Sequence, residues 1–210
     1  MNDFFLIKYG PEIIQRTGEH LFLVIISIGI ATIIGIPLGL LITRNKNLRK
    51  PVLGIANILQ TIPSLALFGF LIPVPIIGGI GETPAIVALT LYSLLPIIRN
   101  TYTGITSVDA AIIEAGRGMG MTDKELLFQV EIPLALEFIL AGVRVAMVIA
   151  IGIATIGAAI GAGGLGVFIF RGIAVVNNQL ILAGAVPAAV IALVADLGIG
   201  WLSKRLGVRS

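Results

Sequence analysis

The sequence predicts an all-α fold, a polytopic membrane bundle of five transmembrane helices. Hydrophobic residues make up 57% of the chain and charged residues 12%, whereas an ordinary soluble domain has roughly 45 to 50% and about 25%. Several stretches carry no charge over about 20 residues, the helix length that crosses a bilayer core about 30 Å thick. No repeat, low-complexity tract or linker divides the chain, so we expect one domain over residues 1–210.

Five segments approach or reach this length. In chain order they are Leu21–Thr43, Val52–Ile72, Pro84–Ile98, Phe138–Ala159 and Leu180–Leu202. The second is expected to end before Pro73 because proline breaks a helix, and the third is short, so it should continue past Arg99 or tilt little. Before the first span, Pro11 can open a short surface helix through Gln15, and His20 suits an interfacial position.

The distribution of basic residues predicts the orientation of the spans. The connection between the first two spans holds basic charges and no acidic ones, namely Arg44, Lys46, Arg49 and Lys50. Cytoplasmic loops carry such an excess of Lys and Arg, so this connection should lie inside the cell and the N-terminus outside. The tail with Lys204, Arg205 and Arg209 then lies inside as well.

Several chemistries lack the residues that they need. There is no cysteine, and one histidine leaves no histidine pair for a metal site. Gly161–Gly166 matches the dinucleotide pattern Gly-x-Gly-x-x-Gly, but it ends a predicted membrane helix instead of following a strand. The phosphate-loop pattern Gly-x-x-x-x-Gly-Lys-Ser/Thr is absent. We therefore expect no enzyme activity, cofactor or metal in this chain, and its net charge of +3 does not suggest nucleic acid.

The third connection, Arg99–Glu137, is long and the most highly charged part of the chain. Its pattern predicts two short helices. The candidate caps are Ser107 or Asp109 before the first helix, Gly118 and Gly120 after it, and Thr122 with Glu125 at the start of the second. Pro133 is expected to end or bend the second helix before the fourth span begins.

Within this connection the chain resembles the permeases of ATP-binding-cassette importers. Their motif has a Glu-Ala-Ala element, a glycine and an Ile-x-Leu-Pro ending. The matching residues are Glu114, Ala115 and Gly116, then Gly120, then Val130, Glu131, Ile132 and Pro133. The departures from the family pattern, at Gly116, Val130 and Ile132, are small or conservative.

The resemblance implies the type I importer permease fold, in which residues of about 105–135 form a coupling helix inserted into a cleft of a separate ATPase subunit. The coupling residues would be Glu114, Ala115, Gly116, Gly120, Ile132 and Pro133. Further implied partners are a second permease copy or a related permease, ATP held by the ATPase subunits, and an extracytoplasmic substrate-binding protein, all at the cell membrane. The alternative is a surface hairpin without a partner.

Three further segments narrow the resemblance to permeases for osmoprotectants such as glycine betaine, carnitine and choline. They are Gln60–Leu65, Tyr92–Pro96 and Arg99–Gly104. The implied function is import of such a solute by alternating access. Permeases for methionine or other amino acids share the number of spans and a similar loop, so they remain the alternative. A stand-alone secondary transporter is less favoured, because the chain has one acid within a span and no evident repeat.

Prolines within predicted spans mark candidate points of the translocation path. Pro63 and Pro96 free backbone carbonyls that nearby hydroxyls such as Ser64 or water must satisfy. Broken helices commonly line transport paths, although a packing kink explains both prolines equally well. Tyr92 can contact a quaternary ammonium group through its ring face, or it can pack on a neighbouring span.

Arg144 and Asp196 are charges within the fourth and fifth predicted spans. One hypothesis is a structural ion pair between these two helices, because unpaired charges are costly in a membrane. Snorkelling of Arg144 to the interface is the alternative.

Overall fold

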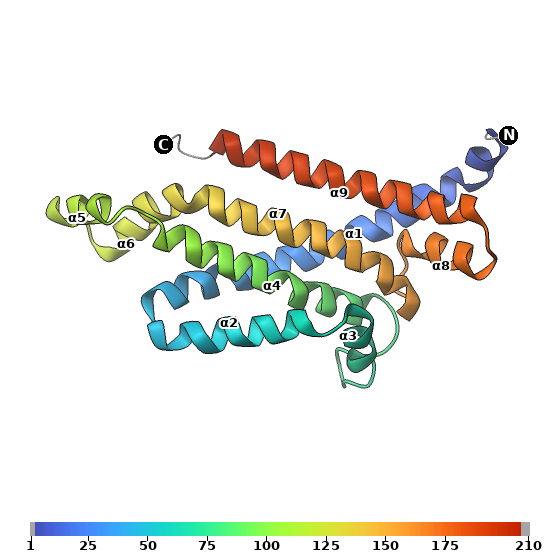
Figure 1. The fold of residues 1–210 in the computed structure, drawn as a ribbon, viewed down its shortest axis with the longest axis horizontal. Coiled ribbons are helices and arrows are strands. Elements are labelled where there is room, and N and C mark those ends of the chain that lie inside the picture. The colour runs from blue at the N-terminus through green and yellow to red at the C-terminus, as the bar shows by residue number, and fades with distance from the viewer. Residues whose placement is uncertain (1–2, 207–210) are drawn as a thin grey trace.

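The computed structural model describes the backbone of residues 3–206 and the side chains of residues 9–206, and this part of the chain is helical with no strand. Four long helices lie side by side: α1 (Asp3–Arg44), α4 (Glu82–Thr106), α7 (Ile132–Gly157) and α9 (Asn178–Leu206) (Figure 1). All four are long and apolar enough to cross a membrane. The all-α membrane bundle predicted from composition is confirmed.

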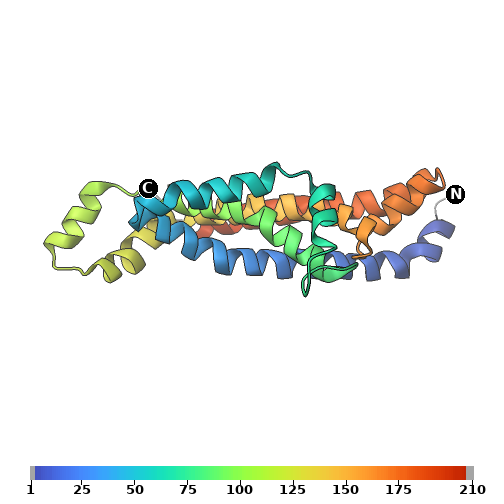
Figure 2. The same ribbon diagram turned by 90° about the horizontal axis from the view of Figure 1, so that it is seen from below.

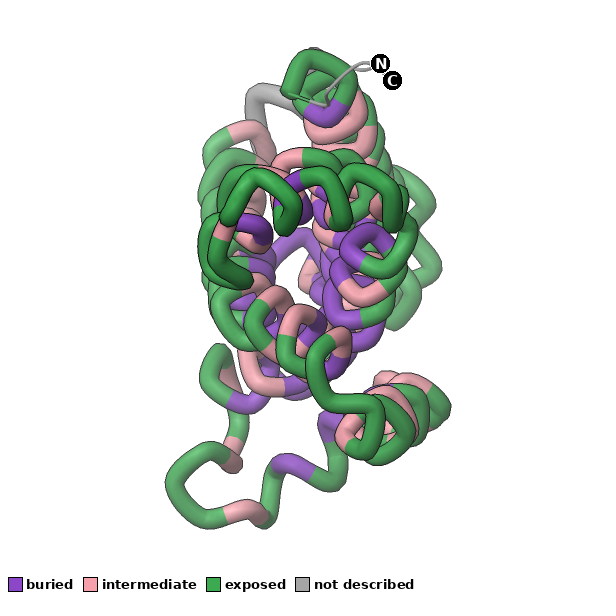
Figure 3. Tube along the Cα trace, turned by 90° about the vertical axis from the view of Figure 1, so that its left-hand side faces the viewer, coloured by how far each residue is buried: buried purple, intermediate pink, exposed green. Residues whose placement is uncertain are grey.

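Helix α4 forms the centre of the bundle and packs against both α1 and α7. In its most apolar part 61% of the residues are buried, against 22% in α9, which therefore lies at the outside of the bundle. Viewed along the bundle, buried positions face inward and exposed positions form the outer surface (Figure 3). The third predicted span does continue past Arg99, to Thr106.

Glycines allow the central helices to approach closely. A Cβ added to Gly35 or Gly39 of α1 would lie 2.8 Å from Ile97 or 2.6 Å from Thr101 of α4. On the other side of α4, a Cβ on Gly142 of α7 would lie 2.7 Å from Asn100. These separations are too short for a side chain, so glycine sets the distance between helices, as small residues commonly do in membrane bundles.

The prediction of the second span as one continuous helix is wrong. It consists of α2 (Lys46–Thr61) and α3 (Ser64–Leu71), which meet at an angle of 100°. The reason is Pro63, which lacks an N–H and disfavours helical backbone at the residue before it. Ile62 is accordingly extended, with ψ of 126°. The chain therefore has four spans, or five if the bent pair counts as one.

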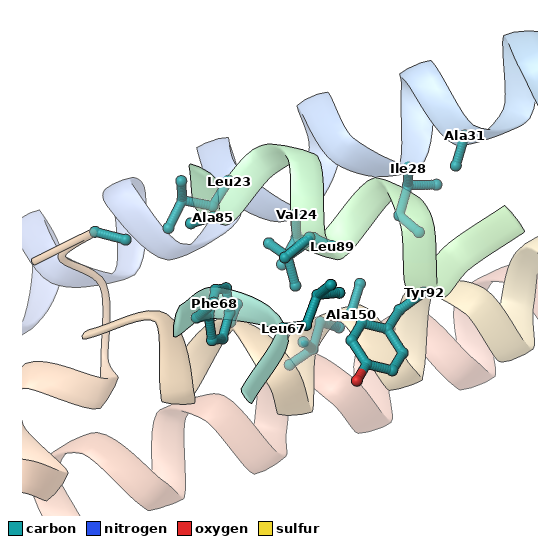
Figure 4. Packing of buried hydrophobic residues seen from close by; sticks show 14 of the residues in the cluster. Leu23, Val24, Ile28, Ala31, Leu67, Phe68, Ala85, Leu89, Tyr92 and Ala150 are labelled. Atoms are coloured by element: carbon teal, nitrogen blue, oxygen red, sulfur yellow. The ribbon is translucent and has the colours of Figure 1, made fainter. Parts of the chain in front are cut away.

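After the bend, α3 turns its apolar face into the bundle. Phe68 is fully buried and Leu67 nearly so, and both pack with α1, α4 and α7 (Figure 4). This packing gives the sharp bend a stabilising contact, because close van der Waals packing holds helices together in a membrane.

The expected surface helix near Pro11 is also wrong, because α1 runs without interruption from Asp3 through Pro11 and His20. The early part of α1 packs on another helix instead of on the membrane surface: Tyr9 and Ile13 contact a buried cluster that contains Phe168. His20 is fully buried between the helices of the bundle.

The connection after α7 contains a helix that the sequence did not indicate. A short 3-10 turn, η2 (Ala158–Ile160), leads into Gly161, Gly163 and Gly164, whose φ angles of 78°, 80° and 74° are in the left-handed region. Helix α8 (Gly166–Ala174) follows and packs on α9. The glycine run is thus a turn, which supports the interpretation of its dinucleotide pattern as accidental.

The ends of the bundle are consistent with the predicted sidedness. The basic α1–α2 connection, the segment between α4 and α7, and the C-terminal end of α9 lie at one end, and the N-terminal end of α1 lies at the other (Figure 1). Arg209, part of the predicted basic tail, lies outside the described residues.

Candidate functional site

The segment between α4 and α7 projects beyond the ends of the other helices (Figures 1 and 2). It contains α5 (Ala110–Gly118), α6 (Asp123–Glu125) and a π-helical stretch, η1 (Leu126–Glu131), that leads directly into α7. The two predicted short helices are therefore present. They stand clear of the bundle end, where another protein can reach them.

Capping side chains and glycine explain where α5 begins and ends. The Asp109 carboxylate accepts a hydrogen bond of 2.9 Å from the N–H of Ala111, so Asp109 is the N-cap. At the other end Gly120 has a φ of 86°. The N–H groups of Gly120 and Met121 donate to the carbonyls of Arg117 at 2.9 Å and Gly116 at 3.1 Å. This is a Schellman motif, in which glycine is favoured at the left-handed position.

The turn after α5 has a small core of its own. Gly116 is buried, and a Cβ there would lie 2.6 Å from the Leu126 side chain and 3.2 Å from the Met121 sulfur. Leu126 is 1% exposed. Gly116 thus allows α5 to pack directly on η1, and the replacement of the family's alanine by glycine has a steric reason in this chain.

A capping box starts the return helix, as the Thr-x-x-Glu spacing predicted. The Thr122 hydroxyl accepts from the N–H of Glu125 at 3.3 Å, and the Glu125 carboxylate accepts from the N–H of Thr122 at 2.8 Å. Two backbone donors that a helix start leaves free are satisfied in this way.

Pro133 does not end the helix, which corrects part of the prediction. Residues 123–160 form one continuous helical segment. Proline removes the N–H that would bond the carbonyl four residues earlier, and the helix widens to π geometry just before it. There the N–H of Ile132 bonds the carbonyl of Leu127, five residues back. Pro133 and Ile132 are half-buried at this junction.

The predicted coupling residues therefore fall into two groups. Glu114 and Ala115 are exposed on α5 and Gly120 is exposed in its turn, whereas Gly116 is buried under α5 and Ile132 and Pro133 lie where η1 joins α7. The first group forms the outer surface of the projecting segment. The second connects that surface to a membrane-spanning helix.

One interaction at this junction was not indicated by the sequence. Glu131, the last residue of η1, is only 3% exposed and forms an ion pair with Arg44, the last residue of α1. An acidic residue in the apolar run before a span was the available signal, but its partner lies far away in the sequence.

Of the translocation-path candidates, Tyr92 and Pro96 lie in the core, Pro63 is exposed and Ser64 is half-buried. Because Pro96 lacks an N–H, the Tyr92 carbonyl has no helical partner. It accepts a hydrogen bond of 3.0 Å from the Gln60 amide of α2. The Tyr92 hydroxyl in turn donates to the Ile62 carbonyl beside the bend. The carbonyls of Tyr92 and Ile62 are thus satisfied by Gln60 and Tyr92. The Thr61 hydroxyl donates to the Ile58 carbonyl at 2.7 Å near the end of α2, so the expectation of hydroxyl donors is confirmed in part.

The predicted ion pair between Arg144 and Asp196 is confirmed. The Arg144 Nε and Nη2 atoms donate to the two carboxylate oxygens of Asp196, which joins α7 to α9. Arg144 lies against Gly200, where a Cβ would be 3.0 Å from the guanidinium. Pairing through two parallel hydrogen bonds fixes the orientation of the guanidinium.

A membrane bundle that carries a projecting helix between two of its spans has the architecture of a permease subunit of a type I ATP-binding-cassette importer. The chain belongs to the family of binding-protein-dependent transport system inner membrane components, whose family model matches residues 35–208. It is therefore a multi-pass protein of the cell membrane. The fold class and family predicted from the sequence are confirmed.

Relatives and solved structures cover nearly the whole chain. The sequence is 50% identical over 206 residues to the osmoprotectant import permease protein OsmW of Salmonella typhimurium. This alignment covers 97% of this chain and 94% of that protein. It is 48% identical over 198 residues to the glycine betaine/carnitine/choline transport system permease protein OpuCD of Bacillus subtilis, covering 94% and 85%. A structure of the inward-facing MetNI methionine transporter matches with a TM-score of 0.84 and 25% identity, covering 99% and 100%.

Proposed function

We propose that this chain is the permease subunit of an importer for an osmoprotectant such as glycine betaine, carnitine or choline. The supporting observation is the identity of 43 to 50% to permeases that are named for these solutes and that cover more than nine-tenths of the chain. In this proposal the chain works with a second permease subunit, with ATPase subunits that bind and hydrolyse ATP, and with an extracytoplasmic binding protein.

The projecting helix α5 is the site where the ATPase subunit acts. Its exposed residues Glu114 and Ala115 are flanked by the apolar side chains of Ile112, which is 45% exposed, and Met119, which is 77% exposed. Apolar side chains at this end, beyond the bundle, need a protein partner to cover them. The small Ala115 side chain lets the partner approach the backbone closely.

Movement of α5 is transmitted to α7 through the continuous helix of residues 123–160. Gly116 packs α5 on Leu126, so a push on α5 also moves η1. The π-helical turn beside Ile132 and Pro133 is the point where the helix can bend, since such turns are often found at functional sites. Closure of the ATPase subunits would thereby change the span arrangement from inward-facing to outward-facing.

The bent pair α2 and α3 supplies the candidate translocation path near Pro63, Ser64, Tyr92 and Pro96. Irregular backbone at membrane depth is tolerated where protein buries it or a cavity adjoins it. Tyr92 is 6% exposed in the described conformation. Contact of its ring with a quaternary ammonium group therefore requires that α3 move away, which would also break the hydrogen bond from the Tyr92 hydroxyl to Ile62.

An amino-acid permease is the second candidate, favoured by the likeness to the methionine transporter structure. Competition for uptake separates the two. Cells that express this chain with its partner subunits and binding protein should take up labelled glycine betaine or choline, and excess unlabelled carnitine should compete while methionine should not. Uptake of methionine without uptake of any quaternary ammonium compound would contradict the proposal.

A further inference from the structure

A cavity of about 680 Å³ lies at the α5 end of the bundle, where α1 turns into α2. Its walls come from the end of α1, the first three turns of α2 and the end of α4. The volume lies within the range of about 300 to 1,000 Å³ that is usual for small-molecule sites. The cavity lies apart from the α3 bend and from the projecting surface of α5, so neither proposed site uses it.

One part of the cavity is strongly cationic. Lys46, Arg49 and Lys50 line it, and none of the described residues in its walls is acidic. Within the described part of the chain, these three cations have no carboxylate partner. The Arg49 guanidinium is stacked over the Tyr102 ring, 4.6 Å from the ring centroid. A cation–π contact of this kind holds the charge in a defined place.

The start of α2 adds to the positive potential at the same place. Asn45 is its N-cap, and the first turn contains no acidic residue. Asn45 already occupies two backbone donors of this turn, since its side chain accepts from the N–H of Asn47 at 3.1 Å and its carbonyl accepts from the N–H of Leu48 at 3.1 Å. The helix start therefore contributes through its dipole. The C-terminal ends of α1 and α4 also line the cavity, and their dipoles oppose that of the α2 start. The three side-chain cations therefore carry the positive potential of this concave space.

The remaining walls are apolar and roomy. Ile42 and Leu53 line the cavity, and Leu53 lies seven residues, or about 10 Å, along α2 from Lys46. A Cβ added to Gly54 would meet nothing within 4 Å. Beyond them on α2, Ile55 and Ile58 are 61% and 64% exposed, as expected of residues that face lipid.

We propose that this cavity binds the phosphate head group of an anionic phospholipid, with the acyl chains along the apolar side of α2. Charge complementarity identifies the head group, because three cations that have no carboxylate partner among the described residues require an anion. The change from cationic to apolar walls favours a lipid over free phosphate. Basic loop residues that only set topology need no concave site, whereas basic pockets between membrane helices bind anionic head groups.

Native mass spectrometry of the purified full-length chain in detergent tests this site, with phosphatidylglycerol and phosphatidylcholine titrated separately. We expect phosphatidylglycerol adducts at lower lipid concentrations than phosphatidylcholine adducts. Gly54→Leu fills the cavity without altering any charge and should weaken phosphatidylglycerol binding about tenfold or more. Gly198→Leu is the matched control, because a Cβ on Gly198 of α9 would also meet nothing within 4 Å and Gly198 does not line the cavity.

A second pair of variants keeps the test independent of how Gly54→Leu folds. Arg49→Gln with Lys50→Gln should weaken phosphatidylglycerol binding by a similar factor, whereas Lys204→Gln with Arg205→Gln removes two charges from the end of α9 and should leave it unchanged. Equal loss in both pairs would overturn the site in favour of diffuse attraction. Equal binding of phosphatidylglycerol and phosphatidylcholine would also overturn the proposal. That result is expected if an acidic protein segment, and not a lipid, fills the cavity. Displacement of the lipid by millimolar inorganic phosphate would identify free phosphate as the ligand and overturn the lipid assignment.

Discussion

Two side chains satisfy the backbone groups that the prolines leave free near the bend. Unpaired carbonyls are costly in a membrane because no water is present to bond them. Gln60 bonds the Tyr92 carbonyl, and the Tyr92 hydroxyl bonds the Ile62 carbonyl. The bend between α2 and α3 is therefore held against α4 by two hydrogen bonds, one to the carbonyl and one from the hydroxyl of Tyr92.

Replacement of this tyrosine hydroxyl should loosen the bend. We expect Tyr92→Phe to lower the stability of the chain in detergent by about 1 to 2 kcal/mol, because the Ile62 carbonyl loses its donor. Thermal unfolding monitored by circular dichroism measures the change. Tyr102→Phe is the control, since among the described residues the Tyr102 hydroxyl has no hydrogen-bond partner. Equal stability of Tyr92→Phe and Tyr102→Phe would contradict the role of this bond.

Glycine at position 120 is required by backbone geometry and not by lack of space. A Cβ there would meet nothing within 4 Å, but the φ of 86° is strained for any other residue. Gly118 is equally open and has no positive φ. The two positions therefore separate the effect of the turn from the effect of side-chain size.

Gly120→Val should impair transport while the protein still inserts into the membrane. Left-handed backbone costs about 1 to 2 kcal/mol for a residue with a side chain, so the turn after α5 shifts and the coupling surface is displaced. We expect uptake of the transported solute to fall about tenfold or more, and Gly118→Val to retain most of it. Immunoblots of membrane fractions control for the amount of protein. Normal uptake by Gly120→Val would mean that this turn plays no part in coupling.

At the scale of elements, the junction of η1 and α7 connects three parts of the molecule. The π-helical turn joins the projecting segment to α7, and Glu131 within it is paired with Arg44 at the end of α1. The buried side of this pair is the carboxylate, since 4% of the Glu131 side chain is exposed against 48% of the Arg44 side chain. In the proposed coupling mechanism, a movement of η1 would therefore displace α1 as well as α7.

A double-mutant cycle measures this connection. Arg44→Gln leaves the Glu131 carboxylate buried without a partner and should cost about 1 to 3 kcal/mol of stability. The loss is smaller than for a fully buried ion pair because the Arg44 side chain is partly exposed to solvent. Adding Glu131→Gln should recover most of this loss, because the buried charge is then removed. Unfolding of the four variants in detergent gives the coupling energy, and strictly additive effects would show that the pair contributes nothing.

The pair of Arg144 and Asp196 connects α7 to α9 in a similar way. Asp196→Arg alone should lower uptake because two cations then face each other between the helices. Combining it with Arg144→Asp should restore uptake at least in part. Failure of the double variant to recover transport that each single variant loses would count against a structural role for the pair.

At the scale of the whole molecule, length and apolarity predicted the bundle, four of its spans and the position of the projecting segment. Local signals also predicted the caps, since Asp109, Gly120 and Thr122 act within a few residues of their own position. The features that the sequence missed depend on distant contacts. The unbroken α1 depends on packing of Tyr9 and Ile13 near Phe168, and the ion pair of Glu131 depends on a partner 87 residues earlier in the chain.

The angle at Pro63 illustrates the same limit. The proline predicted a break, but the size of the bend is set by where Phe68 and Leu67 find buried positions. The π-helical turn before Pro133 was equally invisible, because proline is compatible with a helix end, a kink or a widened turn. Which of these occurs depends on the packing of Leu126 and Ile132 on either side of it.

The central claim is that an ATPase subunit docks on α5. The chain has no cysteine, so single cysteines can carry a photoactivatable crosslinker without further changes. In membranes that contain the assembled transporter, Ala115→Cys on α5 should crosslink to the ATPase subunit. Val176→Cys, at an 88% exposed position after α8 near the opposite end of the bundle, should not. Crosslinking at Val176 but not at Ala115 would contradict the account.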